Sequence, residues 1–231
     1  PSTVAEAGNA EANLHLFCRE LDDIQAKIRV LQRRMDRQRR ANNPGNYNPD
    51  GTVKKGKLRW KNSKRYLKTR AKFAELNRRQ AAYRKSLHGK LINDILRRGN
   101  EIHLEKISYK AWQVTFGKSV NYRAPGMFVS GLKRKAEAGG GSLNEFPTNG
   151  TALSQTCQCG RKLKKKLSDR WHRCECGVSA QRVLYSAFLA RHVKIDGEGK
   201  HFLDAESAVK EWPAIKPLLD KAVVDARKKY W

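Results

Sequence analysis

Four cysteines in two short repeats are the residues of this chain best suited to chemistry. Cys157 and Cys159 lie in CQCG, and Cys174 and Cys176 lie in CECG, with fourteen residues between the two pairs. Each repeat puts two thiolates on a tight turn that ends in glycine, which lets the backbone turn its amides toward the sulfurs. Two such turns joined by a hairpin supply four sulfurs around a zinc ion. We therefore predict a structural zinc site, a zinc ribbon.

The ligand set predicts a structural metal and not a catalytic one. Four protein ligands leave no coordination position open for water. One residue separates the cysteines of each pair, where two is the usual number, but the repetition of Cys-x-Cys-Gly favours the same site. His172 is the alternative ligand if one thiolate does not bind. The fifth cysteine, Cys18, stands apart, and an odd count argues against a disulfide framework.

The charge balance points to a polyanionic partner. Lysine and arginine number 49 against 22 acidic residues, a net charge of +27. Phosphate backbones neutralise such a surface, because each contact releases condensed counterions. No apolar run reaches the roughly 18 residues that span a bilayer, and residues 1–10 lack the pattern of a signal peptide. We expect a cytoplasmic, nucleoid-associated protein that binds DNA and RNA and has no membrane partner.

A basic helical hairpin is the first element that could position these cations. Leu21, Ile24, Ile28, Leu31 and Met35 follow helical spacing, and arginines fill the positions between them. Turn-forming residues 42–56 interrupt this helix, and a second one is predicted from about 61 to 98, with a stripe that continues through Phe73, Leu76, Tyr83 and Leu87. A solvated face is the alternative reading of the arginines, although such a face would mix charge signs.

The remaining pattern alternates strands and helices, which predicts an α/β fold with a parallel or mixed sheet. Two strands flank a turn at Gly8, and a later strand ends at Glu105. Pro213 and Pro217 are expected to split the last helical region into two pieces. The predicted strands are 2–6, 13–17, 101–105 and 143–146, and the predicted helices are 125–138, 180–193 and the two pieces within 204–231.

The order of these parts resembles the TnpB family of transposon-encoded, RNA-guided DNA endonucleases, which are related to type V CRISPR effectors. The resemblance rests on LEKISYKAW at 104–112, SQTCQCG at 154–160 and CECGVSAQRVLYSAFLA at 174–190, and it covers roughly residues 1–193. It implies an RNase H-like (RuvC) mixed sheet with a helical hairpin insertion and a zinc-ribbon insertion. It also implies a transposable element as the source, and guide RNA and DNA as partners.

The resemblance also implies a metal-dependent nuclease site, which this chain completes only in part. Glu105 matches the second acidic position of the family, although a surface glutamate at a strand end is the alternative reading. The first aspartate is expected just before Pro1, and Val183 stands where the third is expected. Three carboxylates hold two ions in such sites, so Mg²⁺ is expected only if the site is completed. Asp169 and Glu175 are poor substitutes because they lie in the ribbon.

Three hypotheses follow. The chain is a TnpB-like remnant that binds nucleic acid without cutting, a fragment of an active RNA-guided endonuclease, or a zinc-ribbon DNA-binding repressor or accessory factor that needs no guide. The expected domains are a partial RuvC-like core at 1–156 with the hairpin at 20–98, the ribbon at 157–177, a closing helix at 178–193 and a helical tail at 194–231. The predicted nucleic-acid contacts are Arg33, Arg34, Arg37, Arg40, Lys164, Lys165 and Arg182.

Overall fold

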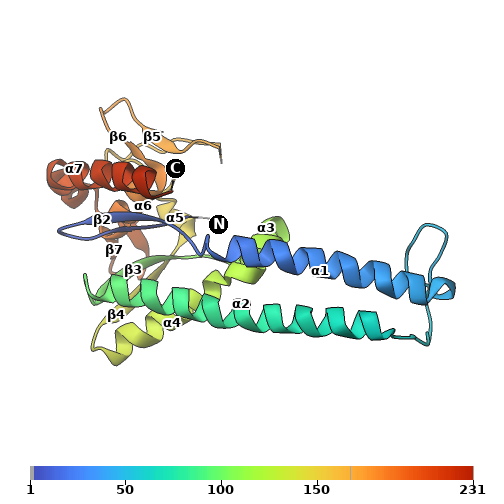
Figure 1. The fold of residues 1–231 in the computed structure, drawn as a ribbon. Helices are drawn as coiled ribbons and strands as arrows, with labels where there is room; N and C mark the ends of the chain where they lie inside the picture. Colours follow the sequence, from blue (N-terminus) through green and yellow to red (C-terminus); the bar gives the residue numbers. More distant parts are fainter. Residues whose placement is uncertain (1–2, 167, 231) are drawn as a thin grey trace. The chain divides into compact units, whose positions relative to one another are not determined.

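The chain is a mixed α/β protein in which the strands pair two by two. The computed structural model describes residues 3–166 and 168–230, and within these ranges it has seven α-helices and eight strands (Figure 1). The chain divides into two compact units, one formed by Cys18–Leu87 and the other by the residues before and after that range. In the described ranges, no helix has the length and apolar character needed to cross a bilayer.

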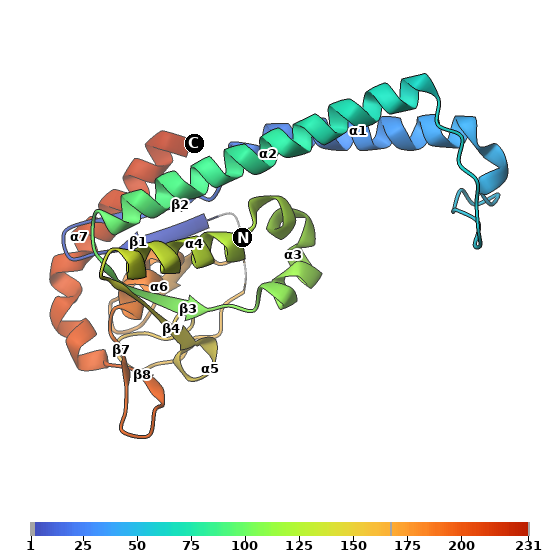
Figure 2. The same ribbon diagram turned by 90° about the horizontal axis from the view of Figure 1, so that it is seen from below.

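The first unit is the predicted helical hairpin. Helix α1 (Leu21–Asn42) and the first part of helix α2 (Lys64–Leu96) run side by side in both views (Figures 1 and 2). Leu21 and Ile28 of the predicted stripe are buried, which confirms the apolar face of α1. Acidic residues in the first turn of α1 and basic ones in its last turn complement the helix dipole.

The predicted stripe on α2 is wrong at Tyr83, whereas Phe73, Leu76 and Leu87 are half-buried. Tyr83 is 42% exposed, whereas Gln80 is buried and its amide donates to Gln25 Oε1 at 2.9 Å. Gln80 lies four residues after Leu76 and therefore on the same face of α2, so a polar side chain occupies this position of the stripe. The inner face of this hairpin is therefore partly polar.

Two strand pairs begin the second unit. Strand β1 (Thr3–Ala7) pairs antiparallel with β2 (Ala12–Leu16), within one or two residues of the prediction, and Ser2 lies outside the described residues. Strand β3 (Glu101–Lys106) pairs parallel with β4 (Ser142–Pro147), as the strand–helix–strand pattern predicts. A Cβ on Gly141 would lie 2.2 Å from the carbonyl oxygen of Asn100, so only glycine allows β4 to start so close to the residue before β3.

The connection between β3 and β4 contains one helix that the sequence pattern missed. Helix α4 (Pro125–Ala138) has its predicted bounds, but helix α3 (Tyr109–Arg123) precedes it. Helix α3 is kinked at Phe116, and its Val114 is 88% exposed. Its apolar residues do not gather on one face, so helical periodicity could not reveal it.

The C-terminal part alternates short elements and then ends in a long helix. Helix α6 is shorter than predicted, because Ala180 belongs to strand β6 and Val193 to strand β7. Residues of the buried core lie along α6, among them Leu184, Tyr185 and Phe188. The elements are helix α5 (Thr148–Thr151), strands β5 (Trp171–Arg173) and β6 (Ser179–Gln181), helix α6 (Arg182–Ala190), strands β7 (Val193–Ile195) and β8 (His201–Leu203), and helix α7 (Ala205–Tyr230).

The predicted division of the tail is wrong, because α7 is one helix that contains both prolines. Pro213 and Pro217 are exposed, whereas Ile215 and Leu219 are buried. A proline leaves the carbonyl four residues earlier without its helical hydrogen bond. On an exposed face water can satisfy that carbonyl, so the burial of the opposite face holds the helix together.

Candidate metal centre and cationic surfaces

Two turns of the same backbone design carry the four cysteines. Gly160 and Gly177 adopt φ values of 84° and 90°, which strain any other residue. The amide of Gly160 donates to the Cys157 carbonyl at 2.9 Å, and that of Gly177 donates to the Cys174 carbonyl at 3.0 Å. One further backbone bond closes each turn: the Cys157 amide donates to Arg161 O and the Cys174 amide donates to Val178 O, each at 2.9 Å. The repeat in the sequence is thus a repeat in the structure.

The four sulfurs form one cluster that fits zinc. Cys157 Sγ lies 3.5 Å from Cys176 Sγ, and Cys159 Sγ lies 3.6 Å from Cys174 Sγ. All four sulfurs lie within 4.8 Å of one another. A tetrahedron of sulfurs at about 2.3 Å from zinc has edges of about 3.8 Å, so the spacing suits that ion. The predicted ligands Cys157, Cys159, Cys174 and Cys176 are brought together, and they could hold a metal such as zinc.

The two turns provide different electrostatic surroundings for their first thiols. Burial raises the pKa of Cys157 to about 12. A hydrogen bond from the Cys176 backbone lowers the pKa of Cys174 to about 7. A buried thiol of high pKa gains most from a cation, because metal coordination deprotonates the sulfur and removes the cost of an unpaired buried charge. Of these two thiols, Cys174 is therefore the one that ionises more readily.

A buried tyrosine supports the first turn from behind. Tyr185 of α6 is fully buried, and its hydroxyl accepts from the Gln158 amide at 3.0 Å. The same hydroxyl lies 3.6 Å from Cys157 Sγ and 3.3 Å from Gln158 Oε1. Tyr185 thereby joins the cysteine cluster to the core, a role that the sequence pattern did not reveal. The only sequence signal for this role is that Tyr185, in QRVLYSA, falls at a helical spacing.

His172 lies outside the sulfur cluster. Its ring is buried and packs at a tilt of 39° against Tyr185, with 4.5 Å between ring centroids. Its Nδ1 contacts Lys165 Nζ. Burial, and then Lys165, lower the pKa of His172 to about 4, so the ring is neutral at pH 7. In this arrangement His172 is a core residue beneath the ribbon and not a ligand.

The cations predicted in the ribbon region divide into exposed and engaged groups. Lys164 is exposed. Lys165 is half-buried and reaches Ser154 O at 3.3 Å, and burial lowers its pKa. Arg182 donates to Lys166 O at 2.8 Å and so fixes the chain that links the two turns. Of these three, Lys164 presents its charge most openly to a ligand.

The predicted cations of α1 divide in the same way. Arg33, Arg34 and Arg37 are exposed. Arg40 pairs with Asp36 at 2.9 Å, donates to Gly51 O at 2.7 Å and lies over the Tyr47 ring. Three internal partners make Arg40 a residue that orders the loop after α1. The exposed arginines remain the candidates for phosphate contact.

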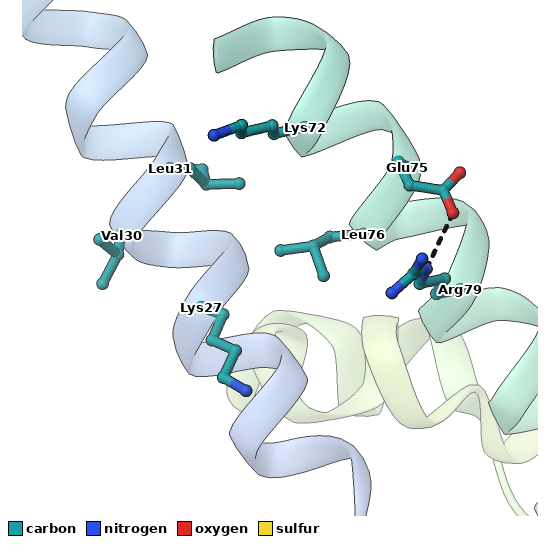
Figure 3. A pocket seen from close by; sticks show the side chains of 7 residues that line it. All are labelled: Lys27, Val30, Leu31, Lys72, Glu75, Leu76 and Arg79. Atoms are coloured by element: carbon teal, nitrogen blue, oxygen red, sulfur yellow. Dashed lines mark hydrogen bonds and ion pairs between the residues drawn. The ribbon is translucent and has the colours of Figure 1, made fainter. Parts of the chain in front are cut away.

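A groove runs between α1 and α2 with an apolar floor and charged walls (Figure 3). Leu31 and Leu76 extend toward each other from the two helices, and Glu75 pairs with Arg79 at 2.8 Å. The groove has a volume of ≈ 480 Å³. The two helices therefore do not pack fully against each other in their middle. Lysine and arginine side chains line both sides of the groove.

The positions that the resemblance assigns to nuclease chemistry hold one carboxylate. Glu105 lies near the end of β3, and burial raises its pKa while a hydrogen bond with Thr148 opposes that shift. Val183 lies in the first turn of α6, where the Gln181 side chain caps the helix by accepting from the Leu184 amide at 2.8 Å. Asp169 accepts from the Lys166 amide, and Glu175 pairs with Arg161. Both of these carboxylates therefore bond within the ribbon. Pro1, before which the first aspartate is expected, lies outside the described residues.

Comparison of the chain with protein-family models and with curated proteins finds no match.

Proposed function

We propose that this chain is a zinc-stabilised nucleic-acid-binding protein of the TnpB type that does not cut DNA. The four-sulfur cluster carries the proposal, because its spacing suits zinc and it clamps a segment rich in exposed lysine and arginine. A net charge of +27 gives the surface a strong attraction for phosphates. Guide RNA and DNA are the partners that the TnpB resemblance implies.

An RNase H-like core is part of the proposal, and the strand pairs support it. Among the residues that the structure describes, β1 pairs only with β2, and β3 pairs only with β4. Helix α6 packs against β1, β2 and β3. One further strand between β1 and β3 would join the two pairs into a five-stranded mixed sheet on α6. In the TnpB resemblance, the first aspartate is expected just before Pro1.

The proposed lack of cleavage rests on Val183. An apolar side chain offers no ligand atom, and a single Glu105 does not neutralise two divalent ions. Purified chain is expected to bind DNA and RNA, with affinity that falls steeply as salt rises, and to leave both intact in Mg²⁺. Robust cleavage in that assay would overturn the proposal, and so would salt-insensitive binding.

Glu105 favours a second candidate, a fragment of an active RNA-guided endonuclease. Its burial and raised pKa are typical of a carboxylate held ready for a metal ion or a proton. The test joins the chain to the upstream segment with Asp-x-Gly, if its gene encodes one, and compares Val183 with Val183→Asp. Cutting that appears only with Val183→Asp supports the first candidate, and cutting with Val183 present supports the second.

A zinc-ribbon repressor or accessory factor predicts a different result in the binding assay. Such a protein binds DNA without any guide. Preparations of the proposed TnpB-type protein are expected to copurify with RNA, and nuclease treatment is expected to weaken their binding to matched DNA. Tight DNA binding by RNA-free protein would favour the repressor.

A further inference from the structure

Residues 43–63 join α1 to α2 at the end of the helical hairpin, and we call them the tip loop. All five of the loop's cations are exposed, and in the part of the chain that the structure describes none of them makes an ion pair. The loop's one acidic side chain, Asp50, is occupied by the amide and hydroxyl of Thr52 at 2.8 and 2.7 Å. The cations are Lys54, Lys55, Lys57, Arg59 and Lys61.

Hydrogen bonds to asparagine side chains hold this loop in one shape. Asn43 is buried, and its Nδ2 donates to Arg39 O at 2.9 Å and to Lys61 O at 3.0 Å. Its Oδ1 accepts from the Lys61 amide at 2.6 Å. Asn46 Nδ2 donates to Arg59 O at 2.8 Å, which gives the end of the loop before α2 a second attachment to its start. Loops of this length are uncommon and are usually functional or disordered. This one is ordered, with a 3-10 helix at Pro44–Asn46 and an antiparallel bridge between Tyr47 and Val53.

Aromatic side chains in the loop are occupied by arginines of α1. The Arg39 guanidinium lies 3.7 Å from the centroid of the Trp60 ring, and Arg40 lies 4.8 Å from that of Tyr47. The two rings meet edge to face with 5.8 Å between centroids. Base stacking requires a free ring face, and one face of each ring is already taken by a guanidinium group while the two rings pack against each other. The aromatic residues therefore shape the loop, and the exposed cations are its contact groups.

The chemistry of these cations selects the partner. Lysine and arginine that are exposed and lack internal partners bind phosphate oxygens. An anionic membrane is the other phosphate surface, but attachment there uses exposed apolar anchors. In the tip loop Val53 is exposed, whereas Trp60 and Tyr47 are held in the arginine stacks. The loop suits a nucleic-acid backbone.

We infer that the tip loop is a preorganised site for the phosphate backbone of a nucleic acid, which it contacts through its cations without stacking on bases. This inference rests on the proposed nucleic-acid binding and adds a site to it. DNA and RNA share the phosphate chemistry, so binding through this loop should not depend on base sequence. The ordered shape matters because it presents the charges without an ordering cost at the moment of binding.

The experiment neutralises the loop and, separately, an equal charge elsewhere. The loop variant carries Lys54→Gln, Lys55→Gln, Lys57→Gln and Arg59→Gln. The control variant carries four substitutions of the same kinds at exposed positions of α7, namely Lys210→Gln, Lys221→Gln, Arg227→Gln and Lys228→Gln. Binding of duplex DNA, of duplex RNA of the same sequence and of single-stranded DNA is measured by fluorescence anisotropy over a range of salt concentrations, after circular dichroism has shown equal helix content.

For duplex DNA, each lost phosphate contact reduces the slope of log affinity against log salt by about 0.9. The loop variant should lose about 2 to 4 from that slope and about 10-fold or more in affinity for duplexes of unrelated sequence, while the control changes the slope by less than about 1. Equal losses in both variants would overturn the inference, as would a loop variant that binds like the wild type. If the wild-type chain binds none of the nucleic acids, the proposed function itself fails.

Two further arms sharpen the result. A larger loss on duplex RNA than on duplex DNA would assign the loop to RNA, and the reverse result would assign it to DNA. The other phosphate surface is tested with vesicles of phosphatidylserine and phosphatidylcholine. Loop-dependent binding to these vesicles, with loop-independent binding to nucleic acid, would overturn the inference.

Discussion

The tip loop and the ribbon formed around the four cysteines both present exposed positive charge but are ordered by different forces. The ribbon gathers four sulfurs within 4.8 Å of one another around a site that suits a metal ion. The tip loop has no such cluster, and its order comes from asparagine amides and from arginine–aromatic stacks. In the described structure the tip loop contains no strand, and the ribbon's strands β5 and β6 have three residues each, so each region depends on a further source of order.

The two sources of order predict which change disrupts each surface. Metal binding in a ribbon is coupled to its folding, so the ribbon should fail as a unit when the metal leaves. A network of neutral hydrogen bonds contributes about 1 kcal/mol per bond, so the loop should loosen step by step. Perturbations that act on one region should spare the other.

Loss of the metal should have the largest effect. The variant Cys157→Ser should abolish tight zinc binding and unfold the ribbon, since structural zinc contributes about 10–16 kcal/mol in small zinc domains. Zinc content by elemental analysis and protease sensitivity across residues 154–181 measure the result. Helices α1 and α2 should stay folded in this variant.

The matched control for that variant is Cys18→Ala. Cys18 is buried but lies outside the sulfur cluster. The control should keep its full zinc content. A Cys157→Ser chain with one zinc per molecule and an intact ribbon would contradict the comparison.

Removal of the loop's central amide should have the second largest effect. The variant Asn43→Ala deletes three hydrogen bonds that join Asn43 to Arg39 and Lys61 and leaves their backbone groups without those partners. The tip loop should lose about 2–3 kcal/mol of local stability. Limited trypsin digestion should then cut faster at Lys54, Lys55 and Lys57 while zinc content stays constant.

The control is the exposed neighbour Asn62→Ala, because no hydrogen bond of the Asn62 side chain is found in the described structure. Its digestion rate should match that of the wild type. Equal cleavage of Asn43→Ala and wild type would show that the amide network does not order the loop.

The tyrosine behind the cysteine cluster should have a smaller effect. The variant Tyr185→Phe removes the hydroxyl that contacts Gln158 and Cys157 and preserves the packed ring. Partners of metal ligands typically contribute 10- to 100-fold to metal affinity, and we expect a loss of about 10-fold here. Competition with a chromogenic chelator measures it, with the exposed Tyr83→Phe as control. An unchanged affinity would limit Tyr185 to a packing role.

Local signals in the sequence predicted much of this fold. The paired Cys-x-Cys-Gly repeats located all four clustered cysteines, and the apolar stripe from Leu21 located α1. The parallel pairing of β3 and β4 followed from the strand–helix–strand order. These features have a short repeat or a strict period, which a single sequence can display.

Other features depend on contacts between distant residues and escaped prediction. Helix α7 continues through Pro213 because its opposite face is buried, which local propensity does not report. Arg40 looked like a phosphate ligand, but Asp36, Gly51 and Tyr47 engage it. Tyr185 is 28 residues from Cys157 in sequence yet meets its sulfur. In each case tertiary packing decided the role.

Acidification should lower the stability of the two units over different pH ranges, and this is the smallest of the expected effects. None of the six histidines lies in Cys18–Leu87, whereas His192 is buried between α6 and α7, 3.0 Å from Glu211 and 3.1 Å from Ser207. Burial lowers the pKa of His192, with Glu211 opposing, so the unfolded chain binds a proton more readily. Stability from the neutral imidazole is therefore full above about pH 6.5 and declines as the pH falls below it, and the lowered pKa of His172 in the same unit acts in the same direction.

The hairpin should respond only in a more acidic range. Hydrogen bonds from Arg78, and then Arg79, lower the pKa of Glu75 to about 2, so its contribution is full above about pH 4.5 and is lost as the pH falls toward 2. Hydrogen exchange on zinc-saturated protein, corrected for intrinsic rates, should show α6 and α7 losing protection between pH 7 and 5 while α1 stays constant. In His192→Asn the loss in α6 and α7 should shrink. Protection that falls equally in both units over this range would mean that their stabilities are coupled, and that the separation argued from their different sources of order is wrong.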